Sequence, residues 1–318
     1  PLMQLMMRMD DSMAAVPISD LLWSFETFPT QFKDNQFNIP ESGNGVPDIL
    51  DEVRWELDWI LKMQDAASGG FYQKVWPNNS DQTPDKDKSQ RFVYDKVGEQ
   101  KNVRATATTA NAVAVLARGS VAFKTVDREY SQKLLRAAQN GWKYLQAHPE
   151  DIVVRGMTGS DENDDDNRQW AAAELYRANG DASGRKHFLE NYQKFTKYWQ
   201  SKNDNAYGED LSMLALLAYL KTPNPDAQVK SWFRDQFNTW RTTNIERWKN
   251  SVWQNVLLDE DYYWGSNAVA LQTNLLLAVG SKILGTYDRE IVDVSRANLN
   301  YILGVNPLRF SYVTGYGE

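Results

Sequence analysis

The chain has 318 residues, 42% of them apolar and 24% charged, which is enough apolar material for one large core or two smaller ones. A formal net charge of −7 gives no electrostatic reason to expect nucleic acid or an anionic membrane as a partner, and no stretch approaches the roughly 18 apolar residues of a membrane span. The absence of cysteine excludes disulfides, thiolate metal sites and cysteine nucleophiles.

Helical periodicity runs through most of the chain and predicts an all-α protein. Only residues 91–94 and 152–155 alternate in the manner of short strands. The predicted helices, in chain order, are residues 18–28, 47–64, 105–123, 128–147, 167–179, 184–198, 206–221, 226–241, 267–284 and 288–303.

Two kinds of helix alternate along the chain. Some are rich in alanine and apolar on most faces, as expected for helices surrounded by protein: 105–117, 170–175 and 267–279. Others carry a polar face, as expected for helices with one side in water: 128–147, 184–198 and 288–303. This succession favours an α/α toroid, and a six-hairpin barrel would need about two helices more than the ten predicted. No linker-like break interrupts residues 16–304, so we expect a single domain over residues 1–318.

Long loops separate several helices, and the chain is rich in aromatic residues. The loops cover residues 68–103, 149–168 and 242–265, and loops of this length on a compact scaffold are often functional. The chain has 12 Trp, 15 Tyr and 12 Phe, a content typical of a site that stacks flat ligands, with core packing as the alternative for each residue. The loops are therefore where we expect a ligand.

Residues 39–64 read IPESGNGVPDILDEVRWELDWILKMQ: a glycine-rich turn, Pro47 at a helix start and an apolar face behind it. This run is similar to a hallmark of glycoside hydrolase family 9. The segments at 164–176, 262–267, 301–307 and 311–318 resemble the same family in the same order. The resemblance implies an (α/α)6 barrel, here missing one or two helices, with a cleft for β-1,4-glucan, an inverting endoglucanase-type mechanism and no required cofactor.

The resemblance also directs attention to the two catalytic carboxyl groups. Inversion needs one carboxylate that activates water and one acid that protonates the leaving oxygen. The family's Asp-Ala-Gly-Asp motif is not intact in the atypical segment 1–16, where Asp10 is the first candidate for the base and Asp11 the second. The family's acid lies beyond the segment that ends at Glu318, so the family domain looks truncated at both ends and we expect these 318 residues to be a poor catalyst.

Substrate contacts are expected from aromatic side chains in the Tyr-Tyr-Trp-Gly-Ser-Asn segment. Trp264 matches a family tryptophan that stacks on a glucosyl ring, while Tyr262 and Tyr263 are weaker candidates for the same cleft. Trp199 resembles another stacking residue of the family. Packing in the core is the alternative for each of the four.

The acidic run 161–167 lies where many members of the family bind calcium. Clustered oxygen ligands before a helix suit Ca²⁺, and the candidates for a structural calcium site are Asp164, Asp166, Asn167 and the more distant Asp204. The alternative is solvated negative charge at a helix N-terminus. Asn167 replaces a family glutamate and removes one charge, which would weaken such a site.

Three functional hypotheses remain open. The first is a hydrolase of cellulose or a related β-glucan, which the family resemblance implies to be secreted or periplasmic in a bacterium and monomeric, with carbohydrate-binding or Ig-like domains in a longer form. The second is a carbohydrate-binding remnant of such an enzyme, which would bind sugar without releasing reducing ends. The third, a polysaccharide lyase, fits poorly because the chain is acidic and has only two histidines.

Overall fold

The computed structural model describes residues 11–77, 91–93, 96–97, 100–101, 104–152, 163–194, 210–262 and 265–316. The chain divides into two compact units, Pro1–Tyr192 and Gln193–Glu318. Each unit is described separately below. Our expectation of a single domain over the whole chain stays a prediction.

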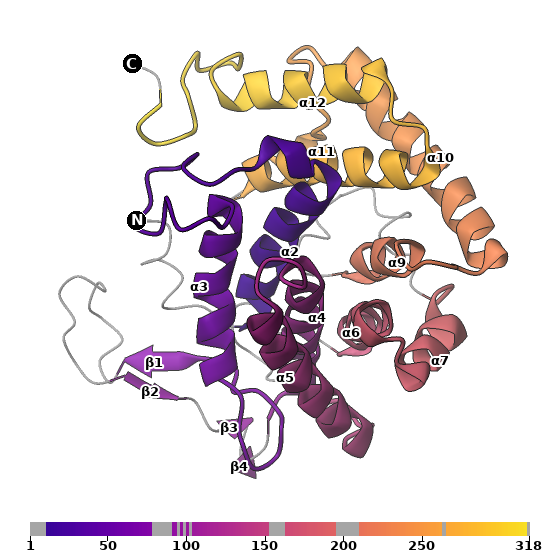
Figure 1. Ribbon diagram of the computed structural model, residues 1–318. Helices are drawn as coiled ribbons and strands as arrows, with labels where there is room; N and C mark the ends of the chain where they lie inside the picture. The colour runs from indigo at the N-terminus through magenta and orange to yellow at the C-terminus, as the bar shows by residue number, and fades with distance from the viewer. Residues whose placement is uncertain are drawn as a thin grey trace. The chain divides into compact units, whose positions relative to one another are not determined.

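All ten predicted helices are present, and the all-α class is confirmed (Figure 1). The first unit contains α2 (Asp11–Thr27), η1 (Pro29–Gln31), α3 (Asp48–Lys62), α4 (Thr106–Ala122), α5 (Arg128–Ala147), α6 (Asp165–Asn179) and α7 (Ala182–Asn191). The second contains α9 (Ser212–Leu220), α10 (Ala227–Asn250), η2 (Asp259–Asp261), α11 (Ser266–Leu284) and α12 (Arg289–Ile302). Within the part of the chain that the structure describes, no helix is long and apolar enough to cross a membrane.

The strands are short and belong to two hairpins of the first unit. β1 (Val75–Pro77) pairs antiparallel with β2 (Arg91–Val93), which confirms the strand predicted there. β3 (Lys96–Val97) pairs antiparallel with β4 (Gln100–Lys101). Ile152 belongs to no strand, and the rest of the second predicted strand lies outside the described residues.

Two helices extend well past the predicted boundaries, whereas α7 ends at Asn191 rather than 198 and α9 begins at Ser212 rather than 206. α2 begins at Asp11 and continues through Pro17, because Ala14, Ala15 and Val16 are buried and packing outweighs the hydrogen bond that proline cannot donate. α10 continues to Asn250, nine residues past the predicted end, because its apolar face goes on through Ile245. The predicted loop at 242–265 is therefore shorter and begins at Ser251.

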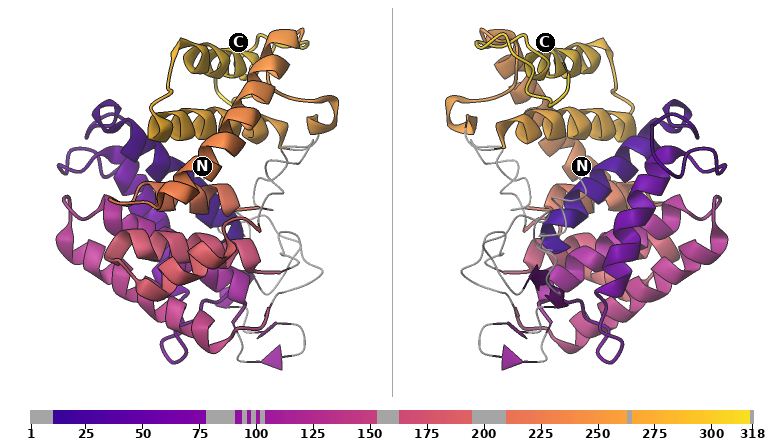
Figure 2. Two further views of the ribbon diagram at one scale, coloured as in Figure 1. Left: turned by 90° about the vertical axis from the view of Figure 1, so that its right-hand side faces the viewer. Right: turned by 90° about the vertical axis from the view of Figure 1, so that its left-hand side faces the viewer.

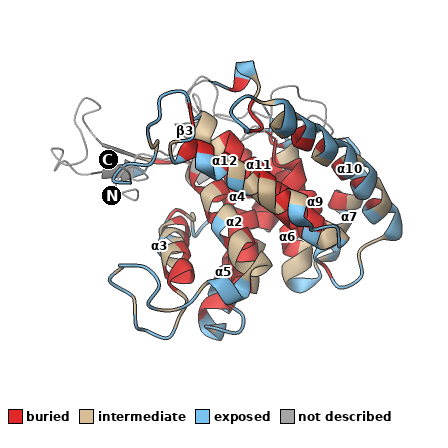
Figure 3. Cartoon of the chain, turned by 90° about the horizontal axis from the view of Figure 1, so that it is seen from above, coloured by how far each residue is buried: buried red, intermediate tan, exposed pale blue. Residues whose placement is uncertain are grey.

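α4 is the central helix of the first unit. It packs against α2, α3, α5 and α6, and nearly all of its residues are buried, as its alanine-rich sequence predicts. The glycines allow close approach: a Cβ at Gly119 would stand 2.7 Å from Leu57 Cδ1. α5, by contrast, has one exposed face (Figure 3). Its N-terminus is capped by the Asp127 side chain, which accepts a hydrogen bond from Tyr130 N.

A charged network lies inside this first core. Arg118, fully buried on α4, donates to Glu174 Oε1 at 2.7 Å and lies 3.2 Å from Glu26 Oε1. Arg177 pairs with the same two glutamates. The Arg118 guanidinium also sits over the indole of Trp23, with its carbon 3.6 Å from the ring centroid. Each buried charge therefore has an opposite charge beside it, which offsets its desolvation.

In the second unit α11 and α12 lie side by side and pack against α10 (Figure 2). The two helices are joined at Gly285, whose φ of 72° suits glycine and ends α11. Asn298 of α12 donates to Asn274 Oδ1 on α11 at 2.7 Å and accepts from Val256 N at 3.1 Å. This buried amide therefore fixes the loop after α10 to the α11 and α12 pair.

Candidate functional site

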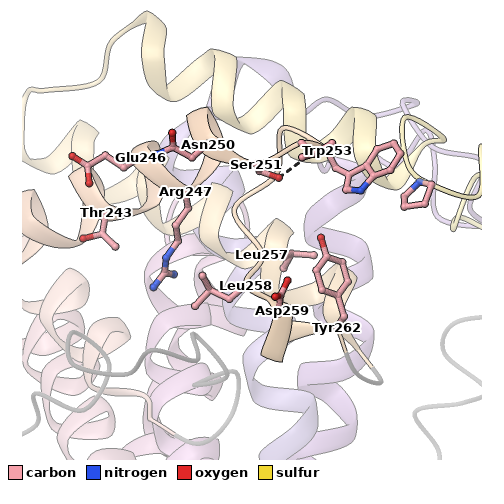
Figure 4. A pocket seen from close by; sticks show the side chains of 12 residues that line it. Thr243, Glu246, Arg247, Asn250, Ser251, Trp253, Leu257, Leu258, Asp259 and Tyr262 are labelled. Carbon is pink, nitrogen blue, oxygen red and sulfur yellow. Dashed lines mark hydrogen bonds between the residues drawn. The ribbon is translucent and has the colours of Figure 1, made fainter.

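A groove with a volume of about 640 Å³ opens in the second unit (Figure 4). Its walls come from the last turns of α10, the loop that follows and η2. We call it the Tyr262 groove; it is lined by Thr243, Glu246, Arg247, Asn250, Ser251, Val252, Trp253, Leu257, Leu258, Asp259, Tyr262 and Pro307.

The groove combines exposed aromatic rings with charged side chains. Tyr262 is 46% exposed and Trp253 is 38% exposed, so both rings retain surface on which a ligand can stack. Arg247 extends from α10 toward the side formed by Leu258 and Asp259 (Figure 4). Glu246 and Asp259 add carboxylates to the lining. Apolar rings with a few polar groups between them are the surroundings that a pyranose needs, since its ring has an apolar face and polar edges.

The loop between α10 and η2 is held by its own polar side chains. Ser251 Oγ accepts from Trp253 N at 3.3 Å and donates to Asn255 Oδ1 at 3.2 Å. Asn255, fully buried, also accepts from Leu257 N at 3.2 Å. The position of Trp253 is therefore set by a local hydrogen-bond network before any ligand binds.

The same asparagine positions Tyr262. Asn255 Nδ2 donates to the Tyr262 hydroxyl at 3.0 Å, which anchors the far end of the ring. The Tyr262 hydroxyl also lies near Tyr301. Burial raises the pKa of Tyr301, and the neighbouring hydroxyls of Tyr262 and Tyr312 raise it further. Tyr262 thus presents its ring to the groove and its hydroxyl to the interior.

Asp261 is the buried member of the Asp-Glu-Asp run before Tyr262. Its Oδ2 accepts from Leu258 N at 2.7 Å, and burial raises its pKa while the charge of Arg247 lowers it. The side chain is 1% exposed. Asp261 therefore closes the η2 turn, whereas Asp259 is the carboxylate that lines the groove.

The other predicted catalytic and sugar-binding residues cannot be placed around this groove. Asp10, Trp199, Tyr263 and Trp264 lie outside the described residues. Asp11 is the first residue of α2, and its side chain is not described. Among the predicted substrate contacts, Tyr262 is the one that the structure describes, and its role in binding sugar stays a prediction.

The predicted calcium ligands lie in the first unit, apart from Asp204, which is outside the described residues. Asp164 is buried, and its Oδ1 accepts from Arg168 Nε at 2.6 Å. Asn167 is buried on another side, where it donates to Asn111 Oδ1 at 3.0 Å. Asp166 is partly exposed. Asp164 and Asn167 thus also make packing contacts of their own, to Arg168 and to Asn111.

Over the described ranges, no three or more histidine, cysteine, aspartate or glutamate side chains gather in a way that could hold a metal. The carboxyl groups of Asp151 and Asp164 are neighbours. Burial raises the pKa of Asp151, and the nearby Asp164 raises it further. Calcium binding by the 161–167 segment stays a prediction.

Sequence reasoning did not single out Trp253, Asn255 or Arg247. Trp253 lies in one of the long loops expected to hold ligand, and a tryptophan beside Gln254 and Asn255 in a loop was a usable signal. No sequence pattern pointed to Arg247, because the helix predicted over 226–241 ends before this residue.

Comparison with known proteins identifies the family. The sequence profile described as "Glycosyl hydrolase family 9" matches residues 12–318. The chain belongs to glycosyl hydrolase family 9. This confirms the resemblance carried by residues 39–64 and by the four later segments.

Named relatives of this family 9 chain agree with the match. It is 28% identical over 315 residues to Endoglucanase D of Acetivibrio thermocellus, covering 96% of this chain and 48% of that protein. It is 28% identical over 316 residues to a xyloglucan-specific endo-beta-1,4-glucanase of Bacteroides ovatus, covering 92% of this chain and 51% of that protein. The chain therefore spans about half the length of the curated relatives it matches.

Solved structures of family 9 enzymes share the fold. A metagenome-derived glycoside hydrolase family 9 endoglucanase matches with a TM-score of 0.83 and 29% identity, covering 98% of this chain and 56% of that one. The structural neighbours are (α/α)6 barrel enzymes, which confirms the predicted fold class.

Proposed function

We propose that this family 9 chain acts on β-1,4-glucans and that its reaction is hydrolysis of the β-1,4-glucosidic bond with inversion, in the manner of an endoglucanase. The family match over residues 12–318 carries the proposal. The Tyr262 groove supports it, because its exposed tyrosine and tryptophan suit the flat faces of glucosyl rings and its charged side chains suit their hydroxyls.

The chemistry requires two carboxyl groups roughly 6.5–9.5 Å apart, so that a water molecule fits between the base and the anomeric carbon. We assign the base to Asp10, with Asp11 as the second candidate, and we assign the acid to no residue of these 318. Trp264, Tyr263 and Trp199 join Tyr262 as proposed sugar contacts.

Release of reducing sugar from carboxymethylcellulose tests this function. We expect the unmodified chain to release reducing sugar slowly, because no acid is assigned. Asp10→Asn should lower that rate further if Asp10 is the base, while Asp11→Asn lowers it much less. Proton NMR of the first products shows whether the α-anomer forms, as inversion requires. A product that keeps the β-configuration, or full activity in Asp10→Asn and Asp11→Asn alike, would contradict the assignment.

The second candidate function is sugar binding without turnover, favoured by the departure of residues 7–17 from the family's motif. Calorimetric titration with cellohexaose separates the two, because a binding protein gives an affinity but no reducing ends. Xyloglucan should be assayed beside carboxymethylcellulose. Endoglucanase D and the xyloglucan-specific endo-beta-1,4-glucanase are each 28% identical to this chain, so identity does not favour one substrate over the other.

We also propose that the protein is secreted or periplasmic and monomeric. A structural calcium ion would bind at Asp164, Asp166 and Asn167, with Asp204 as a more distant ligand. No cofactor takes part in the proposed hydrolysis. Thermal unfolding with calcium and with EDTA tests the ion: a higher midpoint with calcium that Asp166→Asn removes supports the site, and an unchanged midpoint contradicts it.

A further inference from the structure

Trp253 lines a second groove besides the Tyr262 groove. This groove has a volume of about 230 Å³ and lies between the end of α10 and α12. We call it the Trp248 groove; the residues that matter here are Trp248, Trp253, Gln254, Asp293, Arg296 and Asn300. Since one indole belongs to both linings, the two grooves are neighbours with Trp253 between them.

The lining of the Trp248 groove has the chemistry of a sugar site. It offers two indoles, the carboxamides of Gln254 and Asn300, and the charged groups of Asp293 and Arg296. Planar amide, carboxylate and guanidinium groups can each bond two adjacent hydroxyls of a pyranose. Arg296 and Asn300 are four residues apart on α12 and so share one face of the helix.

The backbone conformation also indicates that this loop has a function. Gln254 has a φ of 52°, a left-handed conformation that costs energy in a residue other than glycine. Its N–H donates to Ser251 O at 3.0 Å and closes the turn that carries Trp253. The turn therefore keeps a glutamine side chain at the groove where glycine would fit the backbone better.

We propose that a β-glucan chain bound in the Tyr262 groove continues across Trp253 into the Trp248 groove, which provides further glucosyl subsites. The inference rests on the proposed function, because it extends the same ligand beyond the first groove. It predicts a dependence on chain length: contacts in the Trp248 groove act on long oligosaccharides and leave short ones unaffected.

The matched variants are Arg296→Ala and Arg289→Ala. Both arginines lie on α12 and both pair with Asp293, at 3.5 and 3.4 Å, but Arg296 lines the groove whereas Arg289 does not. Calorimetric titration of the unmodified chain and of both variants with cellobiose and cellohexaose gives six affinities to compare, with chromatography confirming that the ligand stays intact. We expect Arg296→Ala to weaken cellohexaose binding about tenfold, to leave cellobiose binding unchanged, and Arg289→Ala to change neither.

Trp253→Ala and Asn300→Ala extend the test. Trp253→Ala should weaken cellohexaose binding more than cellobiose binding, and Asn300→Ala should act as Arg296→Ala does. The inference is overturned if Arg296→Ala and Asn300→Ala match the unmodified chain on cellohexaose, or if each weakens cellobiose binding as much. A chain that binds neither sugar and releases no reducing ends overturns the proposed function itself, an outcome distinct from both of these.

Discussion

Trp23 of the first unit and Trp253 of the second lie in opposite surroundings. In the first unit Trp23 is completely buried, under Arg118 and beside Glu26 and Glu174. In the second, Trp253 is 38% exposed between two grooves. Trp23 is therefore a packing residue, whereas we propose that Trp253 contacts a ligand, and the surroundings of each tryptophan decide which role it has. Substitutions should separate the two roles: those in the first unit should change unfolding, and those around the grooves should change sugar binding.

The largest effect is expected at Arg118. Arg118→Met leaves Glu174, which is fully buried, without the cation at 2.7 Å, and loss of one partner of a buried pair typically costs about 3–5 kcal/mol. Chemical denaturation measures the free energy of unfolding. Arg289→Met, which breaks an exposed pair, is the control and should cost less than about 1 kcal/mol. Equal costs at both positions would show that the buried network does not stabilise the first unit.

Among the residues proposed to contact sugar, Trp264 should give the largest effect. Trp264→Ala should weaken oligosaccharide binding by about 1–3 kcal/mol through loss of a stacking surface. Titration with cellohexaose measures it, and thermal unfolding checks that the midpoint stays near that of the unmodified chain. Unchanged affinity together with a lower midpoint would assign Trp264 to the core.

The stability of the first unit should depend on pH through Asp20. Burial raises its pKa to about 7, and the charge of Arg118 opposes that rise. The folded state then holds this proton more tightly than the unfolded state does. The contribution to stability is therefore complete below the ordinary value of 3.8 and is lost as pH rises through about 7.

Asp20→Asn keeps the shape and removes the titration. As pH rises from about 5 to about 8, we expect the free energy of unfolding of the variant to increase by roughly 1–3 kcal/mol relative to that of the unmodified chain. Unfolding midpoints across that range measure the gain. Asp235→Asn, at an exposed position of α10, is the control. A difference between variant and parent that does not change with pH would show that Asp20 ionises normally.

The smallest effect is expected at the Tyr262 hydroxyl. Tyr262→Phe leaves buried Asn255 Nδ2 without its acceptor at 3.0 Å, which should cost about 1 kcal/mol of stability while the ring still stacks on sugar. Tyr262→Ala removes the ring as well and should weaken cellohexaose binding. If the phenylalanine variant loses as much affinity as the alanine variant, the hydroxyl rather than the ring contacts the ligand.

The ten helices, their division into buried and amphipathic kinds, and the family can all be read from the amino-acid order alone. Helices are readable because their apolar period and their caps, such as Asp127 before α5, are local in the chain. The family is readable because residues 39–64 form a long continuous motif.

Packing between distant parts of the chain sets the features that local patterns cannot specify. α2 runs through Pro17 and α10 runs to Asn250 because each buries an apolar face against distant helices. Asp164, predicted from its acidic neighbours to be a calcium ligand, also pairs with Arg168. Trp23 and Trp253 look alike in the sequence, yet one is buried and the other exposed. Burial and pairing depend on residues far apart in the chain, and only folding brings those together.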